Sequence, residues 1–217
     1  MDAAPLEQRD VIDIVVVGFE NRAVVERQMD GLRDNFTDPF HYTLLDNSPS
    51  SPSRAELRAL CETTDVGYVD LPKNPATGRD PSRSHGLALN WGYRHVLRPR
   101  GARWAGVLDP DVFPERRTSV LQILRAQPCF GVPQHRDDRW YLWPGLAFFD
   151  TTYFRDLNFL PEPGLDTGGA NWRFLRALDP TTLREPDRRY VPAPSTVVGQ
   201  YERIGDWLHT FNSSGWR

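Results

Sequence analysis

"WAGVLDPDVFP", residues 104–114, ends an apolar run with two aspartates one residue apart. The segment RWAGVL, residues 103–108, is apolar after its arginine and predicts a buried strand that delivers Asp109 and Asp111 at its carboxyl end. Two like charges at this spacing repel each other, and a cation between them would remove the repulsion. Because Mg²⁺ and Mn²⁺ prefer oxygen ligands, the D-x-D pair could hold such a metal. A solvated turn is the other explanation, since Asp and Pro are both favoured in turns.

Strand and helix signals alternate along the chain before this stretch. They predict strands over residues 11–19, 40–48 and 65–72, and helices over residues 20–36, 48–62 and 82–97. This alternation predicts βαβ units with parallel strands, which is an α/β fold. Ligands of such sheets bind beyond the carboxyl ends of the strands. We therefore expect Phe19, Asp46, Asp70 and Asp109 to share one edge of the sheet.

The second half of the chain is less regular. We expect helices over residues 119–127 and 168–178, and strands over residues 128–134 and 144–150 on either side of an aromatic loop. No repeat and no low-complexity linker occurs. The expectation is one domain over residues 1–217, which could have been excised from a longer polypeptide.

Composition narrows the class of protein. The 26 basic and 29 acidic side chains give a net charge of −3, so no attraction to nucleic acid is expected. Cys61 and Cys129 form no metal or disulfide pattern, which fits a reducing compartment. Residues 1–10 are unlike a signal peptide, and no apolar run approaches the roughly 20 residues that span a bilayer. We expect a cytoplasmic protein without a transmembrane segment, and peripheral membrane attachment stays open.

These segments, in their order, resemble the metal-dependent glycosyltransferases of the GT-A fold, in particular the family-2-like group. The resemblance covers about residues 11–150, and its carriers are IVVVGFENR, LLDNSPS, SRSHGLALNWGYRHV, GVLDPDVFP and PGLAFFDTTYF. It implies a Rossmann-like mixed sheet with helices on both faces. It also implies a hexosyl- or deoxyhexosyltransferase that moves a sugar from a UDP-, GDP- or dTDP-sugar to a carbohydrate or glycolipid acceptor.

The resemblance also implies roles for single residues. Asp109 and Asp111, with His209 from the C-terminal region, would hold Mn²⁺ or Mg²⁺ on the donor diphosphate. The residues implied at the nucleotide are Phe19, Asn21, Arg22 and Asp46 around the base or phosphates, and His85 and Asn90 at the diphosphate. Four of these residues also have an ordinary explanation: a turn cap for Asp46, a solvated helix start for Arg22, a structural role for His85, and a tail histidine outside the metal site for His209.

Asp166, in GLDTGGANW, is the candidate base for an inverting transfer, which needs a carboxylate to take the proton of the acceptor hydroxyl. The related enzymes often have an acidic pair at a comparable place, and this sequence has Asp-Thr-Gly-Gly instead. Asp166 or Thr167 could alternatively cap the following helix. Asp137 and Asp138 are the fallback candidates for the base.

Other classes of protein remain open. A haloacid-dehalogenase-like phosphatase also has D-x-D at a strand end, but normally on its first strand and followed by Thr, where Val112 stands here. A non-catalytic sugar-nucleotide-binding domain would use the same donor residues without a base. A nucleotidyltransferase would need a Gly-rich loop with a lysine after the first strand, which is absent.

Overall fold

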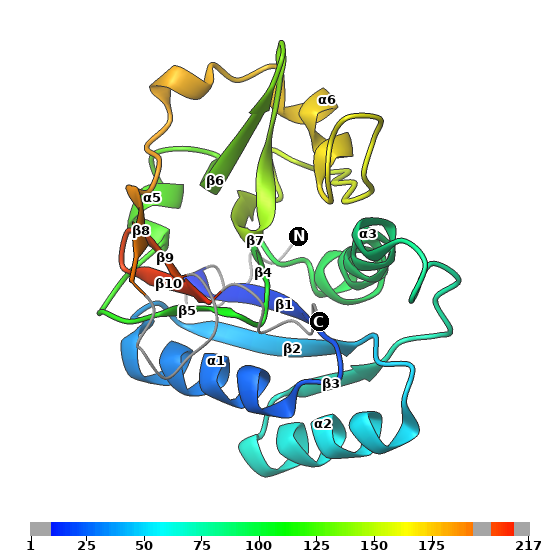
Figure 1. Cartoon of the computed structure of the whole chain (residues 1–217). Coiled ribbons are helices and arrows are strands. Elements are labelled where there is room, and N and C mark those ends of the chain that lie inside the picture. Colours follow the sequence, from blue (N-terminus) through cyan, green and yellow to red (C-terminus); the bar gives the residue numbers. More distant parts are fainter. Residues whose placement is uncertain (1–9, 193–200, 211–217) are drawn as a thin grey trace, which may run out of the picture.

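The computed structural model describes residues 10–192 and 201–210 of the chain. Its main sheet has six strands in the order β3-β2-β1-β4-β7-β6 (Figure 1). The strands are β1 (Ile12–Gly18), β2 (Phe40–Asp46), β3 (Gly67–Asp70), β4 (Trp104–Leu108), β6 (Cys129–Arg136) and β7 (Arg139–Asp150). The first four are parallel to one another, β7 runs antiparallel to β4 beside it, and β6 runs antiparallel to β7. The predicted α/β fold with a mixed sheet is confirmed.

The register brings the carboxyl ends of the parallel strands to one edge. Gly18 pairs with Asp46, and Asp46 pairs with Asp70 on the next strand. On the other side of β1, Val16 pairs with Leu108, the last residue of β4. The chain therefore leaves β1, β2 and β4 at the same edge, as predicted.

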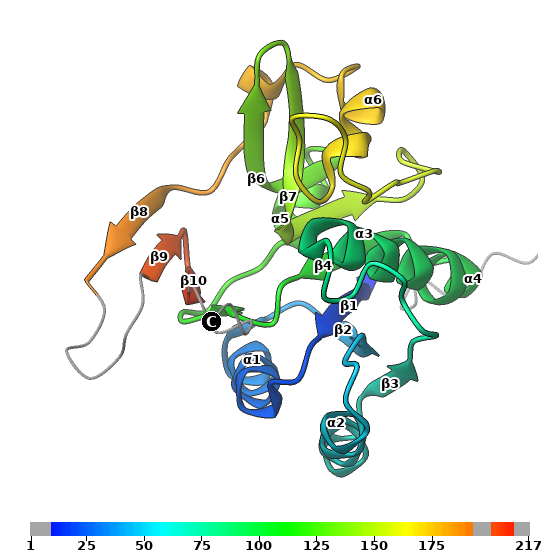
Figure 2. The same cartoon turned by 45° about the vertical axis from the view of Figure 1, so that its right-hand side comes forward.

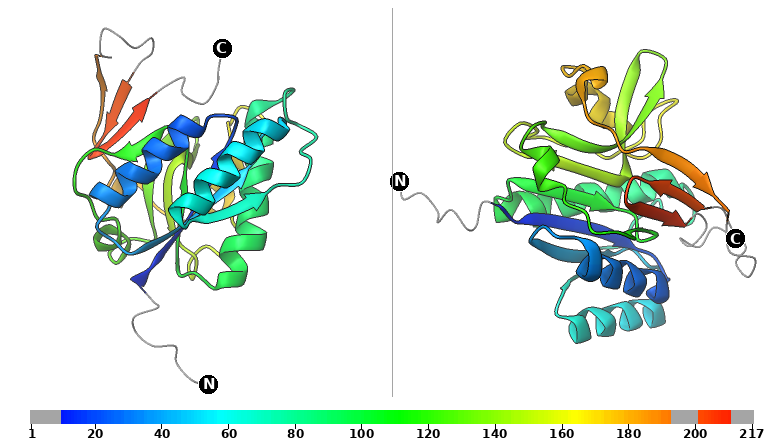
Figure 3. Two further views of the ribbon diagram at one scale, coloured as in Figure 1. Left: turned by 90° about the horizontal axis from the view of Figure 1, so that it is seen from below. Right: turned by 90° about the vertical axis from the view of Figure 1, so that its left-hand side faces the viewer.

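Helices cover both faces of this sheet (Figures 1 and 3). Helices α1 (Arg22–Asn35) and α2 (Ser51–Thr64) lie on one face, and α3 (Pro81–Gly92) lies on the other. A π-helical turn (Tyr93–Leu97) and the short α4 (Arg98–Arg100) continue α3.

The sequence of β1 explains this two-sided cover, because all seven of its residues are buried. Its side chains alternate between the faces, so Ile14 and Val16 join the core under α1, while Val15 and Val17 join the core under α3.

A second, antiparallel sheet was not predicted. It has the order β5-β10-β9-β8 and consists of β5 (Val112–Pro114), β8 (Arg188–Val191), β9 (Tyr201–Ile204) and β10 (Trp207–Thr210). Strands of three or four residues are too short for a clear alternation of apolar and polar residues. Strand β10 lies between β5 and β9, so it places the end of the described chain beside the residues that follow the D-x-D pair (Figure 2).

Two predictions for the second half were wrong in detail. The expected aromatic loop is a long hairpin, because Trp140 and Tyr141 are buried within β7 and only residues 137–138 form its turn. The helix expected over residues 168–178 is only a 3₁₀ turn (Gly169–Asn171) and one turn of helix, α6 (Trp172–Leu175). The remaining short elements are α5 (Leu121–Leu124) and a 3₁₀ turn (Pro180–Thr182).

Some expectations concern parts of the chain outside the described residues. The N-terminal stretch that is unlike a signal peptide lies almost wholly there, in residues 1–9. Among the helices described, none combines the length and the apolar character that crossing a membrane requires.

Candidate functional site

Residues 109–112, here called the aspartate turn, connect β4 to β5. The N–H of Val112 donates to the carbonyl of Asp109 at 3.0 Å, which closes a four-residue turn with Pro110 at its second position. Neighbouring strands hold the same turn. The Asp109 N–H donates to the Gly145 carbonyl in β7, and the Asp111 carbonyl accepts from the Thr210 N–H in β10 at 2.9 Å. The backbone of both aspartates is therefore fixed by one bond within the turn and by two neighbouring strands.

His85 of α3 lies against the first aspartate. Its Nε2 is 3.3 Å from Oδ1 of Asp109, and the two side chains are 23% and 20% exposed. Burial lowers the pKa of His85 to about 4, with the charge of Asp166 acting in the opposite direction. Burial and the same Asp166 charge raise the pKa of Asp109 to about 7. The neutral imidazole of His85 thus faces the carboxyl group of Asp109, and the charge of Asp166 acts on both groups.

His209 of β10 lies against the second aspartate. Its Nε2 is 3.8 Å from Oδ2 of Asp111, and both side chains are buried. On its other side, Nδ1 is 3.7 Å from Oε2 of Glu202, whose Oε1 accepts from Arg188 at 2.8 Å. Burial lowers the pKa of His209 to about 4, and Glu202 opposes that shift. Glu202 was missed from sequence, because it is on a strand that the sequence did not reveal.

Asp166 is exposed at the same site, and the groups around it fix its position. Its N–H donates to the Tyr141 hydroxyl at 3.1 Å, and its Oδ1 accepts from the Thr167 N–H at 2.7 Å. The Thr167 hydroxyl donates to the Ser82 carbonyl at the start of α3. The following 3₁₀ turn has no side-chain cap, so the alternative role of Asp166 or Thr167 as its cap is not observed.

Three of the predicted nucleotide residues follow β1 at the carboxyl edge. Phe19 is partly buried, and Asn21 is the N-cap of α1, where its Oδ1 accepts from the Val24 N–H at 3.3 Å. Arg22 is exposed and lies 3.8 Å from Glu26, one turn along the helix. Their contacts with a nucleotide stay predictions.

Two other predicted residues make contacts within the protein. Asp46 is completely buried, and its carboxylate accepts from the Ser48 N–H and from the Tyr68 hydroxyl at 2.8 Å. Asn90 is also buried; its amide donates to Asn158 at 2.9 Å and accepts from the Phe159 N–H at 2.8 Å. These contacts supply structural roles that need no ligand.

His85 and Asn90 therefore have different surroundings, although both are on α3. An α-helix turns by about 100° per residue, so a separation of five residues turns one side chain about 140° from the other. The structure brings His85 to Asp109 and Asn90 to the segment at residues 158–159.

The chemistry of the aspartate turn fits a divalent cation of the Mg²⁺ or Mn²⁺ type. Carboxylate oxygens and an imidazole are suitable ligands, and a cation would favour the ionised form of Asp109. Within the described residues, no group of three or more His, Cys, Asp or Glu side chains is arranged to hold a metal ion, so Asp109, Asp111 and His209 do not form a complete site by themselves. Such a complete site is not required, because Mg²⁺ is usually bound by one or two carboxylates together with water and substrate phosphates.

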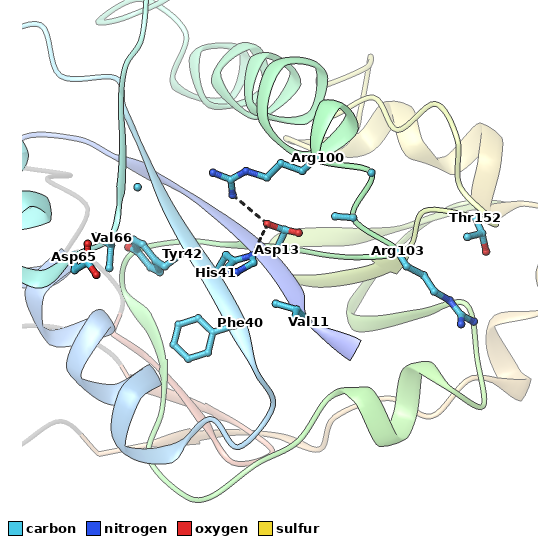
Figure 4. A pocket seen from close by; sticks show the side chains of 13 residues that line it. Val11, Asp13, Phe40, His41, Tyr42, Asp65, Val66, Arg100, Arg103 and Thr152 are labelled. Carbon is cyan, nitrogen blue, oxygen red and sulfur yellow. Dashed lines mark hydrogen bonds and ion pairs between the residues drawn. The ribbon is translucent and has the colours of Figure 1, made fainter. Parts of the chain in front are cut away.

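A groove of about 970 Å³ lies at the opposite, amino edge of the main sheet (Figure 4). Most of its charged side chains have partners: Asp13 pairs with Arg100 at 3.1 Å and lies 3.2 Å from the ring of His41. Arg103 pairs with Asp150 in the same way. The acids and histidines of the carboxyl edge are therefore the better candidate for chemistry.

Comparison with known proteins addresses the fold. No family model matches the sequence, and no curated protein matches it significantly. Among solved structures, the mannosyltransferase PcManGT from Pyrobaculum calidifontis, in complex with GDP-Man and Mn²⁺, is similar with a TM-score of 0.57 and 16% identity. The match covers 87% of this chain and 56% of that protein.

Two more distant similarities are to glycosyltransferases as well. The bifunctional enzyme WbbM matches with a TM-score of 0.48 and 13% identity, over 79% of this chain and 38% of its own. The S. cerevisiae mannosyltransferase Ktr4p matches with a TM-score of 0.46 and 10% identity, over 79% and 62%. The chain thus spans less than two thirds of each of these proteins. The similarity to PcManGT shows that the fold is of the GT-A glycosyltransferase type.

Proposed function

We propose that this chain is a metal-dependent, inverting glycosyltransferase. It would move a hexosyl or deoxyhexosyl group from a UDP-, GDP- or dTDP-sugar to a hydroxyl of a carbohydrate or glycolipid. The observation that supports this best is the meeting of the D-x-D acids with His85 and His209 at the carboxyl edge of a GT-A-type sheet. This is the edge where ligands of open α/β sheets bind.

The donor side of the proposed site is the aspartate turn. Asp109, Asp111 and His209 would hold Mn²⁺ or Mg²⁺, and when bound the cation would stabilise negative charge on the departing diphosphate. His85 carries a neutral imidazole, whose ring N–H can donate to a phosphate oxygen or to Asp109. In the structural neighbour PcManGT, the bound ligands are GDP-Man and Mn²⁺, which supports a donor and a cation of these classes.

The acceptor side of the proposed site is Asp166. Its carboxylate is exposed, and Oδ1 is used by Thr167, while the described part of the chain gives Oδ2 no hydrogen bond. Oδ2 would take the proton of the acceptor hydroxyl as that oxygen attacks the anomeric carbon. Because Tyr141 holds the backbone N–H of Asp166 and Ser82 holds the side chain of the next residue, Thr167, the base would need little reorganisation.

Titration calorimetry with a panel of UDP-, GDP- and dTDP-sugars, first with Mn²⁺ and then with EDTA, tests the proposal. We expect one donor to bind only with metal, and Asp109→Asn or Asp111→Asn to abolish that binding without loss of the fold. NMR of the product then shows whether the anomeric configuration has inverted, and Asp166→Asn should retain donor binding and lose transfer.

Three outcomes would overturn parts of the proposal. Donor binding without turnover on any acceptor, unchanged in Asp166→Asn, would support a binding domain. Release of phosphate from a simple ester such as p-nitrophenyl phosphate, without any sugar transfer, would support a phosphatase. Donor binding that persists in EDTA would remove the metal from the mechanism.

A further inference from the structure

Gln28 of α1 is completely buried and contacts the aspartate turn. Its Nε2 donates to the carbonyl of Asp109 at 2.6 Å and to the carbonyl of Val112 at 2.7 Å. These are the first and last residues of the turn. One buried amide thus connects both ends of the segment that carries the two acids.

The orientation of this amide is fixed by a third contact. The Tyr42 hydroxyl in β2 donates to Oε1 of Gln28 at 3.0 Å. A primary amide has two N–H donors on its nitrogen and a carbonyl oxygen that accepts. The observed orientation points the nitrogen at the two carbonyls of the turn and the oxygen at the Tyr42 hydroxyl, so all three partners are satisfied. Reversing the amide would set its oxygen against two carbonyl oxygens. The sheet, through Tyr42, therefore determines how α1 holds the aspartate turn.

A buried polar side chain at this position needs an explanation. Burying an amide costs free energy unless it is hydrogen-bonded, and an apolar side chain of the same length would pack without that requirement. The other buried residues of α1 are apolar, since Val25, Met29 and Leu32 all join the core. The chain places its polar residue at the contact with the aspartate turn.

We propose that Gln28, oriented by Tyr42, is a positioning residue for the metal site. It sets the shape of the aspartate turn and so the relative direction of the Asp109 and Asp111 carboxylates. This inference rests on the proposed metal site at the two acids. Groups that orient metal ligands from outside typically change metal affinity by about 10–100-fold when mutated.

Mn²⁺ affinity, measured by electron paramagnetic resonance of the free ion in a titration of the protein with Mn²⁺ alone, tests the inference. We expect Gln28→Met, which keeps the length and loses the donors, to weaken Mn²⁺ binding by about 10–100-fold. The matched control is Asn35→Leu. Asn35 is on the same helix, and its amide donates to the Pro114 carbonyl at 3.0 Å, beyond the aspartate turn. Thermal unfolding in EDTA compares the stability of the two variants.

The outcomes separate this inference from the proposed function. If the wild-type protein binds Mn²⁺ neither alone nor with UDP, GDP or dTDP present, the metal site itself is overturned, and the role of Gln28 with it. If the wild type binds and Gln28→Met binds equally well, only the positioning role is overturned. An equal loss of Mn²⁺ affinity in Asn35→Leu would mean that the effect of Gln28→Met comes from lost stability, and this would also overturn the positioning role. If Gln28→Met does not fold, Tyr42→Phe decides: it should weaken Mn²⁺ binding, and unchanged affinity would overturn the inference.

Discussion

Replacing Asn90 by alanine removes a buried amide that joins α3 to the segment at residues 158–159. The Phe159 N–H then loses its acceptor inside the protein, which costs about 1–3 kcal/mol. The lost bond to the Asn158 side chain adds about 0.5–1.5 kcal/mol. We therefore expect the free energy of unfolding to fall by about 2–4 kcal/mol. For a chain of this size, this is a fall of about 4–16 °C in the unfolding midpoint.

Urea unfolding followed by tryptophan fluorescence measures this loss, and the m-value should stay unchanged because the same surface unfolds. Asn35→Ala, which removes one partly buried bond, is the control and should cost about 1 kcal/mol. Affinity for the donor is measured on the same variants. Wild-type stability in Asn90→Ala, together with weaker donor binding, would refute the structural role and support the predicted contact of Asn90 with the nucleotide.

Three further predictions concern stability and thiol reactivity. Gly86→Ala should lower stability by about 1–3 kcal/mol in thermal unfolding, because the new Cβ would lie 2.5 Å from the backbone oxygen of Phe159. Alanine normally favours a helix over glycine, so a stabilised variant would contradict this packing. Tyr68→Phe should cost about 1–3 kcal/mol in urea unfolding, because one oxygen of the buried Asp46 loses its donor; an unchanged midpoint would be inconsistent with that bond. Burial raises the pKa of Cys61 to about 11 and that of Cys129 to about 12, so both thiols should react with a disulfide reagent only on unfolding. Because the folded protein keeps these thiols protonated above their ordinary pKa of 9.0, their contribution to stability should fall as the pH rises from 9.0 toward the raised values. Rapid reaction of the native protein with the reagent would argue against the burial.

The main sheet was predictable because its pattern is local. The run over β1 is β-branched and apolar on both faces, which is typical of a central strand covered by helices, and all its residues are buried. Alternation of such strands with amphipathic helices leaves few topologies open, because crossover connections are right-handed. The position of Asp109 and Asp111 beyond β4 follows from the same pattern.

The contacts of the site residues were harder to predict. His85 and Asn90 were assigned to the same ligand, and the turn of the helix separates them. Asp46 was placed correctly at a strand end, but its burial and its bond to Tyr68 depend on how β3 packs beside β2. A sequence pattern gives the type of element and leaves open which atoms meet.

The sequence by itself determined the parallel core of the sheet, its two helical layers and the strand end that carries the two aspartates. Only the tertiary structure decided what surrounds those aspartates. His209 reaches Asp111 through strands of three or four residues, and Gln28 reaches the aspartate turn from a helix 81 residues away in sequence. Periodicity and burial are properties of neighbours along the chain, and they are written in the sequence. Contacts between distant segments depend on how whole elements pack, and no short stretch of sequence contains that information.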